Sequence, residues 1–402
     1  MTNHPILDDP VRHRILVFIV LLLMIEYHNS IRSRSYLHRN ALTSAHTSSW
    51  KQLLDNGDET SFLHMTGLTR HAFYVFRDIL FTKDELQNLV LGKRKRGRPQ
   101  LLNHEAQLGL LLFYIGSTMG IKWICMIFGI TPSTCSHFIN TMMTRACNKL
   151  EVHPMARVQF PDKDKMAQFA AQIQLREPSI DDVIGFMDGL SLATECTSER
   201  MTQNAMYCGY DCDTMVNNIF LYGPDGKVFF CAINFPGSWA DGAVTRNFLP
   251  FLRGKIGDYK IVVDQGFPRS GDAYGVLVGP LTKKSARKLH ASVRSEMIRR
   301  SNIYVSLRQA SEWGMRALQG SFPRFKKRLP SDSAKREKVI RTIVLVHNLR
   351  THLVGRNQIK SVFDPEYERS LAIEGHDKIY QYYFQEGDYV SDSDDLLDED
   401  AE

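Results

Sequence analysis

The sequence predicts an α/β protein, in which a mixed sheet flanked by helices follows an all-α N-terminal region. Up to about residue 150, apolar residues recur at steps of three and four, as they do on helices. From residue 180 they form short continuous runs, which are typical of buried strands. A helical stretch between the third and fourth runs predicts a crossover, and therefore a mixed sheet.

The size and charge of the chain narrow its class. Its 402 residues, 43% hydrophobic and 23% charged, are enough for two or three globular domains. The net charge is +6, but the last twelve residues hold seven acids and no Lys or Arg, so residues 1–390 carry +13. A basic body suits a polyanion such as nucleic acid, and a basic protein without such a partner is the alternative. Seven cysteines without a CxxC pair indicate reduced thiols in an intracellular protein and argue against a zinc site.

The first region, residues 1–92, is predicted to be helical. Between residues 68 and 81, Phe73, Phe76 and Ile79 follow one another at three-residue steps. The strongly apolar segment 15–25 is shorter than the roughly 20 residues that a membrane-spanning helix needs. We therefore expect a buried N-terminal helix and no membrane partner, with membrane targeting as the alternative.

A basic linker, residues 93–103, separates this region from the next. It opens with KRKRGRPQ, in which the basic residues are Lys93, Arg94, Lys95, Arg96 and Arg98. Such a run fits a plain charged linker, a nuclear localisation signal or an arm in the minor groove of DNA. We favour a linker that doubles as a nuclear signal.

Residues 104–150 have the sequence pattern of a helix-turn-helix. Gly129 and Ile130 predict a tight turn, and Thr131 and Pro132 begin a longer helix after it. The second helix of such a pair can enter a major groove, and an ordinary helical hairpin is the alternative.

The strand-forming part spans residues 180–355. Runs at 183–187, 217–223, 227–234 and 259–263 predict strands, and residues 242–252 predict the crossover helix. The remaining residues, 356–402, form a C-terminal extension whose acidic tail has the composition of a disordered segment.

Two of the predicted strands end on a carboxylate, at Asp188 and at Asp264. A third acid, Glu312, lies on an otherwise apolar helical stretch. Each acid alone fits a turn or a salt bridge, but in α/β sheets functional groups collect at the carboxyl ends of strands. Three carboxylates suit Mg²⁺ or Mn²⁺, and two such ions would support phosphodiester cleavage.

Several further stretches resemble the PIF/Harbinger transposases, a group of DDE-type nucleases. The resemblance covers roughly residues 105–365. It rests on the following stretches in order: FMDGL (186–190), NAMYCGYDCDTMVNNIF (204–220), NFPGSWADGAV (234–244), VVDQGFP (262–268), RQASEWGMRALQGSFPRF (308–325) and IVLVHNLRTHLVG (343–355).

The resemblance implies an RNase H-like core with Asp188, Asp264 and Glu312 as catalytic, metal-binding triad. It implies a nuclear endonuclease that cuts the terminal inverted repeats of a transposon and transfers the freed strand to target DNA. It also implies a Myb-like DNA-binding partner, and pairing of two DNA ends implies a homo-oligomer.

Two features of the resemblance leave alternatives open. The family's Gly-Ser-x-His-Asp stretch reads GSWAD here, with Ala240 in place of the histidine. A decayed or domesticated DNA-binding protein is therefore the alternative function. Arg308 and Arg316 lie one helical turn on either side of Glu312, where they could hold phosphate or pair with the acid.

Overall fold

The computed structural model describes residues 10–33, 37–90, 101–364 and 367. The chain divides into two compact units, residues 1–146 and 147–402, each of which is described by itself. The basic residues 93–98 and the acidic tail lie outside the described residues. The structure therefore does not test the predicted basic linker or the predicted disorder of the tail.

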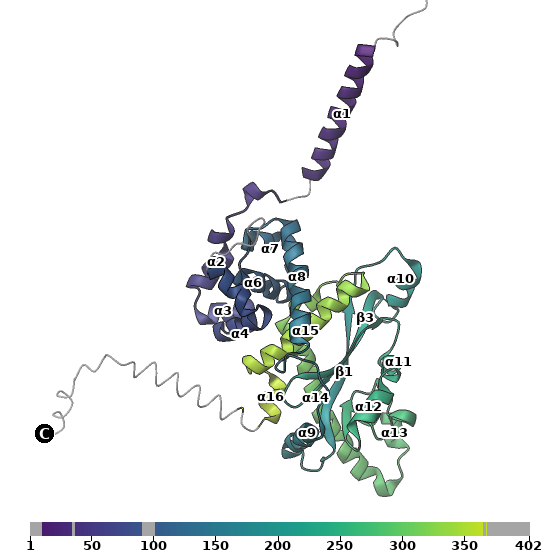
Figure 1. The fold of residues 1–402 in the computed structure, drawn as a ribbon. Helices are drawn as coiled ribbons and strands as arrows, with labels where there is room; N and C mark the ends of the chain where they lie inside the picture. Colours follow the sequence, from purple (N-terminus) through teal and green to yellow (C-terminus); the bar gives the residue numbers. More distant parts are fainter. Residues whose placement is uncertain (1–9, 34–36, 91–100, 365–366, 368–402) are drawn as a thin grey trace, which may run out of the picture. The chain divides into compact units, whose positions relative to one another are not determined.

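The first unit is helical, as predicted (Figure 1). Its helices are α1 (Pro10–Ser33), α2 (Ser49–Asn56), α3 (Glu59–Thr66), α4 (Arg70–Leu80), α5 (Lys83–Val90), α6 (His104–Ile115), α7 (Ile121–Phe128) and α8 (Pro132–Leu150), the last of which runs into the second unit.

An aromatic cluster around Trp50 holds this unit together. The indole stacks on Phe128 with ring centroids 5.4 Å apart and meets Phe113 edge-on at 5.8 Å. It also occupies the place of a side chain at Gly109, where a Cβ would lie 2.3 Å from the ring. The turn between α7 and α8 occurs where predicted, with Gly129 at φ 65°, in the left-handed region.

The prediction that segment 15–25 is buried is wrong. This segment lies in α1, and its side chains from Ile15 to Ile25 are all exposed, by 45% to 63%. The apolar residues surround the whole helix, so burial would require neighbours on every side. Residues Arg12–Ser30 of α1 are long and apolar enough to cross a membrane.

The second unit is built on a six-stranded mixed sheet, which confirms the predicted α/β class. Its strands are β1 (Val183–Ala193), β2 (Tyr207–Cys208), β3 (Asp213–Tyr222), β4 (Val228–Pro236), β5 (Lys260–Val263) and β6 (Leu277–Val278). The order is β2-β3-β1-β5-β6, with β4 paired to β3. β1, β5 and β6 run parallel, and the β1–β3, β2–β3 and β3–β4 pairs are antiparallel.

Helices cover both faces of the sheet (Figure 1). One face packs on α9 (Lys163–Arg176), α11 (Asp241–Arg246) and α12 (Leu249–Ile256). The other contacts α14 (Ala291–Ser321), α15 (Ser333–Leu353) and α16 (Gln358–Phe363). The short helices α10 (Arg200–Met206) and α13 (Lys283–Arg287) complete the unit.

Three details differ from the prediction. β1 does not end at Asp188 but continues to Ala193, because it remains paired with β3 along that length. The predicted helix 242–252 is two helices, α11 and α12, joined by a short break. The short strands β2 and β6 lack an apolar run long enough to be predicted.

Candidate active site

The sheet places Asp188 and Asp264 beside each other. The parallel pairing of β1 and β5 ends with Met187 opposite Val263. Asp188 directly follows Met187, and Asp264 directly follows Val263. Asp188 stays in β1, where it lies opposite Phe220 of β3. Since neighbouring strands lie about 5 Å apart, the two carboxylates share one region at the end of β5.

Helix α14 brings Glu312 to the same place, together with Arg308 one turn earlier. Arg308 Nη1 lies 3.1 Å from Asp264 Oδ1, and Nη2 lies 2.7 Å from Glu312 Oε1. The side chains of Asp264 and Glu312 are 41% and 37% exposed, so these acids face solvent, whereas that of Arg308 is 28% exposed. Arg308 therefore links two of the three predicted site residues.

The two arginines that flank Glu312 on α14 behave differently. Arg308 pairs with the acids, which is one of the two uses that the sequence left open. Arg316 is exposed, and none of the ion pairs among the described residues includes it.

Asp188 is the most buried of the three predicted site acids. Its Oδ1 accepts a hydrogen bond from the Gly189 N–H at 2.8 Å, and its Oδ2 accepts one from Ser311 Oγ at 3.4 Å. Burial raises the pKa of Asp188 to about 6, and the negative charges of Asp264 and Asp241 act in the same direction. The charged form of Asp188 is thus costly at neutral pH unless positive charge is added nearby.

A fourth carboxylate, Asp241, approaches from the opposite face of the sheet. It is the first residue of α11, and a Cβ on Gly189 would lie 2.4 Å from its Oδ1. The missing side chain at Gly189 is therefore what lets Asp241 reach β1. Burial, and then the charge of Asp264, raise the pKa of Asp241. No role was predicted for Asp241, although it is the aspartate that ends the GSWAD stretch and it begins a helix after a Pro-Gly turn.

Asn217 of β3 fixes the turn that leads to Asp241. Its Oδ1 accepts a hydrogen bond from Ser191 Oγ at 2.6 Å, and its amide donates to the carbonyls of Gly237 and Trp239. Ala240, which precedes α11, is exposed and supplies no side-chain hydrogen bond to the start of this helix.

The chemistry of these donors fits a hard divalent cation, because all four acids offer only oxygen and two of them have raised pKa values. In the part of the chain that the structure describes, however, no group of three or more His, Cys, Asp or Glu side chains is arranged to hold a metal ion. Arg308 separates Glu312 from the aspartates by its two salt bridges. The metal-binding role of Asp188, Asp264 and Glu312 therefore stays a prediction.

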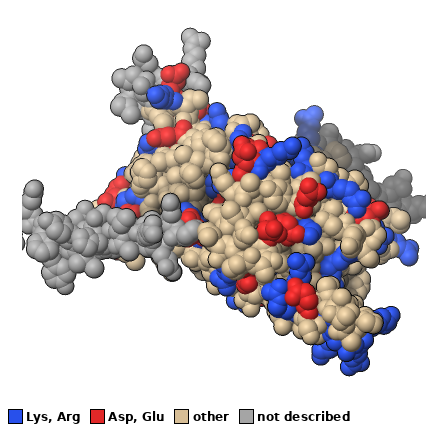
Figure 2. All heavy atoms as spheres, turned by 90° about the horizontal axis from the view of Figure 1, so that it is seen from below, with Lys and Arg blue, Asp and Glu red and all other residues tan. Residues whose placement is uncertain are grey.

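Positive charge is plentiful on the surface. Figure 2 shows Lys and Arg gathered in several clusters on one face, with smaller groups of Asp and Glu between them. The predicted nucleic-acid contacts at Lys93, Arg94, Lys95, Arg96 and Arg98 lie outside the described residues.

The comparison with protein families gives one match. Residues 187–348 match the family described as DDE superfamily endonuclease. The matched stretch begins one residue before Asp188 and contains Asp264 and Glu312 as well as Asp241 and Arg308. It supports a nuclease domain of the DDE type within the second unit. Neither the curated proteins nor the solved structures gave a match.

Proposed function

We propose that this chain is a metal-dependent DNA endonuclease of the PIF/Harbinger transposase type, with an RNase H-like core. The observation that supports the proposal is that Asp188 and Asp264 follow paired residues of β1 and β5, and that Arg308 joins Asp264 to Glu312. The match of residues 187–348 to DDE endonucleases supports the same assignment.

Asp188, Asp264 and Glu312 would hold Mg²⁺ or Mn²⁺. When bound, two such cations would activate the attacking oxygen and stabilise the leaving oxygen of a phosphodiester. Arg308 pairs with the carboxylates of Asp264 and Glu312 and would have to release them to a bound cation, whereas Ser311 orients Asp188. Asp241 adds negative charge behind Asp188, which favours a cation at this edge.

The reaction would have two stages on these same residues. In hydrolysis, a water oxygen bonds to phosphorus, the bond to the 3′ oxygen breaks, and a 3′-hydroxyl is released. In strand transfer, that 3′ oxygen bonds to a phosphorus of target DNA and displaces a second 3′ oxygen. The substrates are the terminal inverted repeats of a transposon and a target site, reached in the nucleus as a homo-oligomer with a Myb-like partner.

The test compares wild type with Asp264→Asn for nicking of DNA that carries the element's ends, with Mg²⁺ or Mn²⁺ and the Myb-like partner present. Asp258→Asn is the matched control, because Asp258 is exposed two residues before β5. We expect cation-dependent nicking by wild type and the control, and none by Asp264→Asn. Nicking that survives in Asp264→Asn would refute the assignment.

A second candidate function is a nuclear DNA-binding protein without cutting activity. Ala240 in place of the family's histidine favours it. It predicts DNA binding by wild type with neither nicking nor metal affinity. Restoration of nicking by Ala240→His would show that this position, and not the carboxylates, had limited the activity.

A further inference from the structure

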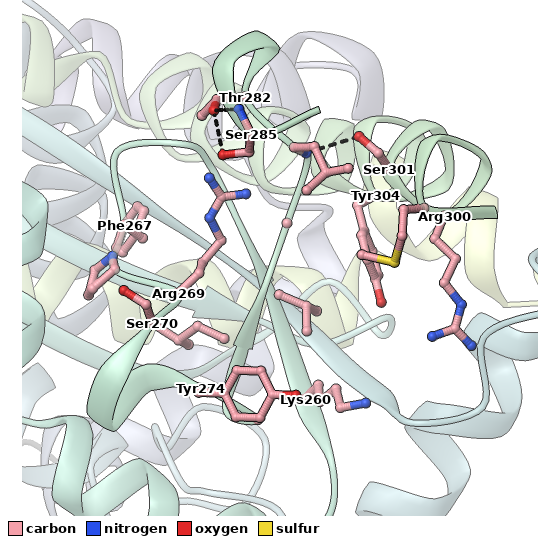
Figure 3. A pocket seen from close by; sticks show the side chains of 17 residues that line it. Lys260, Phe267, Arg269, Ser270, Tyr274, Thr282, Ser285, Arg300, Ser301 and Tyr304 are labelled. Carbon is pink, nitrogen blue, oxygen red and sulfur yellow. Dashed lines mark hydrogen bonds between the residues drawn. The ribbon is translucent and has the colours of Figure 1, made fainter. Parts of the chain in front are cut away.

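A cavity of about 790 Å³ opens beside the candidate active site. It is bordered by the loop after β5, by β6 and by the first half of α14, and Figure 3 shows their side chains arranged around it. Its size falls in the range of sites that take small molecules or single nucleotides. None of the residues placed above in the active site lines it.

The polar lining is basic. Lys260, Arg269 and Arg300 line the cavity, and none of its described lining residues is acidic. Lys260 is paired with Asp182, outside the lining, and Arg300 Nε lies 3.5 Å from the exposed Glu296. Arg269 instead donates a hydrogen bond to the Pro280 carbonyl. This lining suits an anion such as a phosphate.

Arg269 connects the cavity to the active site. Its position five residues after Asp264 puts it in the loop that leaves β5. Burial lowers the pKa of Arg269, and the charge of Asp264 partly offsets that effect. A phosphate held by Arg269 would therefore lie close to the acid that is proposed to act on the scissile phosphate.

The cavity also offers aromatic surface. Tyr274 lines it and is 79% exposed, so one side of its ring is free for a flat group. Tyr304 lines it from α14 and is partly buried, and hydroxyl groups of Ser270 and Ser301 add hydrogen-bonding capacity. An aromatic ring beside basic groups is the combination that binds an unpaired base and its phosphate.

The segment 282–300, which borders the cavity, would bind the backbone of the DNA strand that continues from this nucleotide. Residues 282–300 contain seven Lys or Arg and one Glu, a net charge of +6 that equals that of the whole chain. They include all of α13 and the start of α14, which carry exposed side chains along most of their length. Such a segment can contact several phosphates of a backbone at once.

We infer that this cavity holds one unpaired nucleotide of the DNA strand next to the cut, with its base on Tyr274 and its phosphate on Arg269. The inference rests on the proposed function, because it takes DNA as the substrate. It adds a site that would favour DNA with an unpaired or extruded base near the scissile phosphate.

The test measures binding and not cutting. Fluorescence anisotropy would compare a short blunt DNA duplex with the same duplex carrying a single-stranded thymidine overhang, using the full chain without divalent cation. We expect wild type to bind the overhang duplex more tightly, and Tyr274→Ala to lose about tenfold for that duplex only. Tyr210→Ala is the control, because Tyr210 is 96% exposed and does not line the cavity.

The outcomes separate this site from the nuclease assignment. Equal binding of both duplexes by wild type, or an equal effect of Tyr274→Ala and Tyr210→Ala, would overturn the inference even if nicking is observed. An overhang preference that depends on Tyr274 would support it even if no nicking is found. Tight binding of free thymidine monophosphate without an overhang preference would overturn the assignment to a DNA strand.

Discussion

Replacing Asp188 by asparagine should stabilise the protein, although it should abolish nicking. Burial raises the pKa of Asp188 to about 6, from an unfolded value of about 3.9. The folded state therefore binds more protons than the unfolded state between these two pH values. Stability consequently falls as the pH rises through this window, and the loss is complete above the folded pKa.

The size of the effect follows from the shift. A difference of about two pKa units corresponds to about 3 kcal/mol, which is the most that Asp188 can cost at pH 8. Asparagine avoids this cost and keeps the contacts, since its Oδ1 can accept from the Gly189 N–H and its amide can donate to Ser311 Oγ. For a unit of this size, 3 kcal/mol raises Tm by about 6 to 12 °C.

Thermal unfolding followed by circular dichroism would measure this difference from pH 4 to pH 8. The gain in Tm from Asp188→Asn should be small at pH 4, grow up to pH 6 and level off above it. Asp213→Asn is the matched control: hydrogen bonds from Arg328 lower the pKa of Asp213, so removal of this charge should not stabilise the protein. An advantage that is absent at pH 8, or that does not change with pH, would refute the reasoning.

Three further predictions concern the same unit. Gly189→Ala should displace Asp241, whose Oδ1 would lie 2.4 Å from the new Cβ, and unfolding should show a loss of about 1 to 3 kcal/mol. Arg308→Met should raise the affinity for Mn²⁺ by about fivefold, as measured by calorimetry, because it removes the cation that is paired with Asp264 and Glu312. The substitution should lower the free energy of unfolding by only about 1 kcal/mol. An unchanged affinity for Mn²⁺ would count against a cation site here. Asn348→Leu should destabilise the unit by about 3 kcal/mol in denaturant unfolding, because the buried Asn348 side chain hydrogen-bonds both the N–H and the carbonyl of Val228 at 2.8 Å.

The elements with strong apolar patterns could be predicted from the sequence, and the exceptions have physical causes. The run from Val183 to Met187 predicts a buried strand, but the same pattern stops at Asp188 although the strand does not. Beyond this point β1 is held by its ladder with β3, and the backbone hydrogen bonds of a ladder leave no trace in side-chain composition. Conversely, an apolar run such as residues 15–25 predicts burial only when there are neighbours to bury it, and α1 is exposed.

The candidate site could be predicted only in part for a related reason. Asp188 and Asp264 each end an apolar run, so a strand model brings them to one edge. Asp241 ends no such run, and its approach depends on the absent side chain at Gly189, which is 52 positions earlier. The pairing of Arg308 with Asp264 depends on where α14 crosses the sheet, and helical periodicity does not give that position.

The charge balance of the site bears on whether the chain cuts DNA. Asp188, Asp264 and Glu312 lie near the end of β5, and Asp241 adds a fourth negative charge from the other face of the sheet. Arg308 is the one cation that forms salt bridges with any of them among the described residues. The fold does not require this charge, because asparagine at position 188 could make the same hydrogen bonds at lower cost. Buried acids with raised pKa values beside one another are typical of functional sites, where a ligand supplies the missing positive charge. Ala240 is exposed and leaves this cluster intact, so the electrostatics of the site favour an enzyme over a protein that only binds DNA.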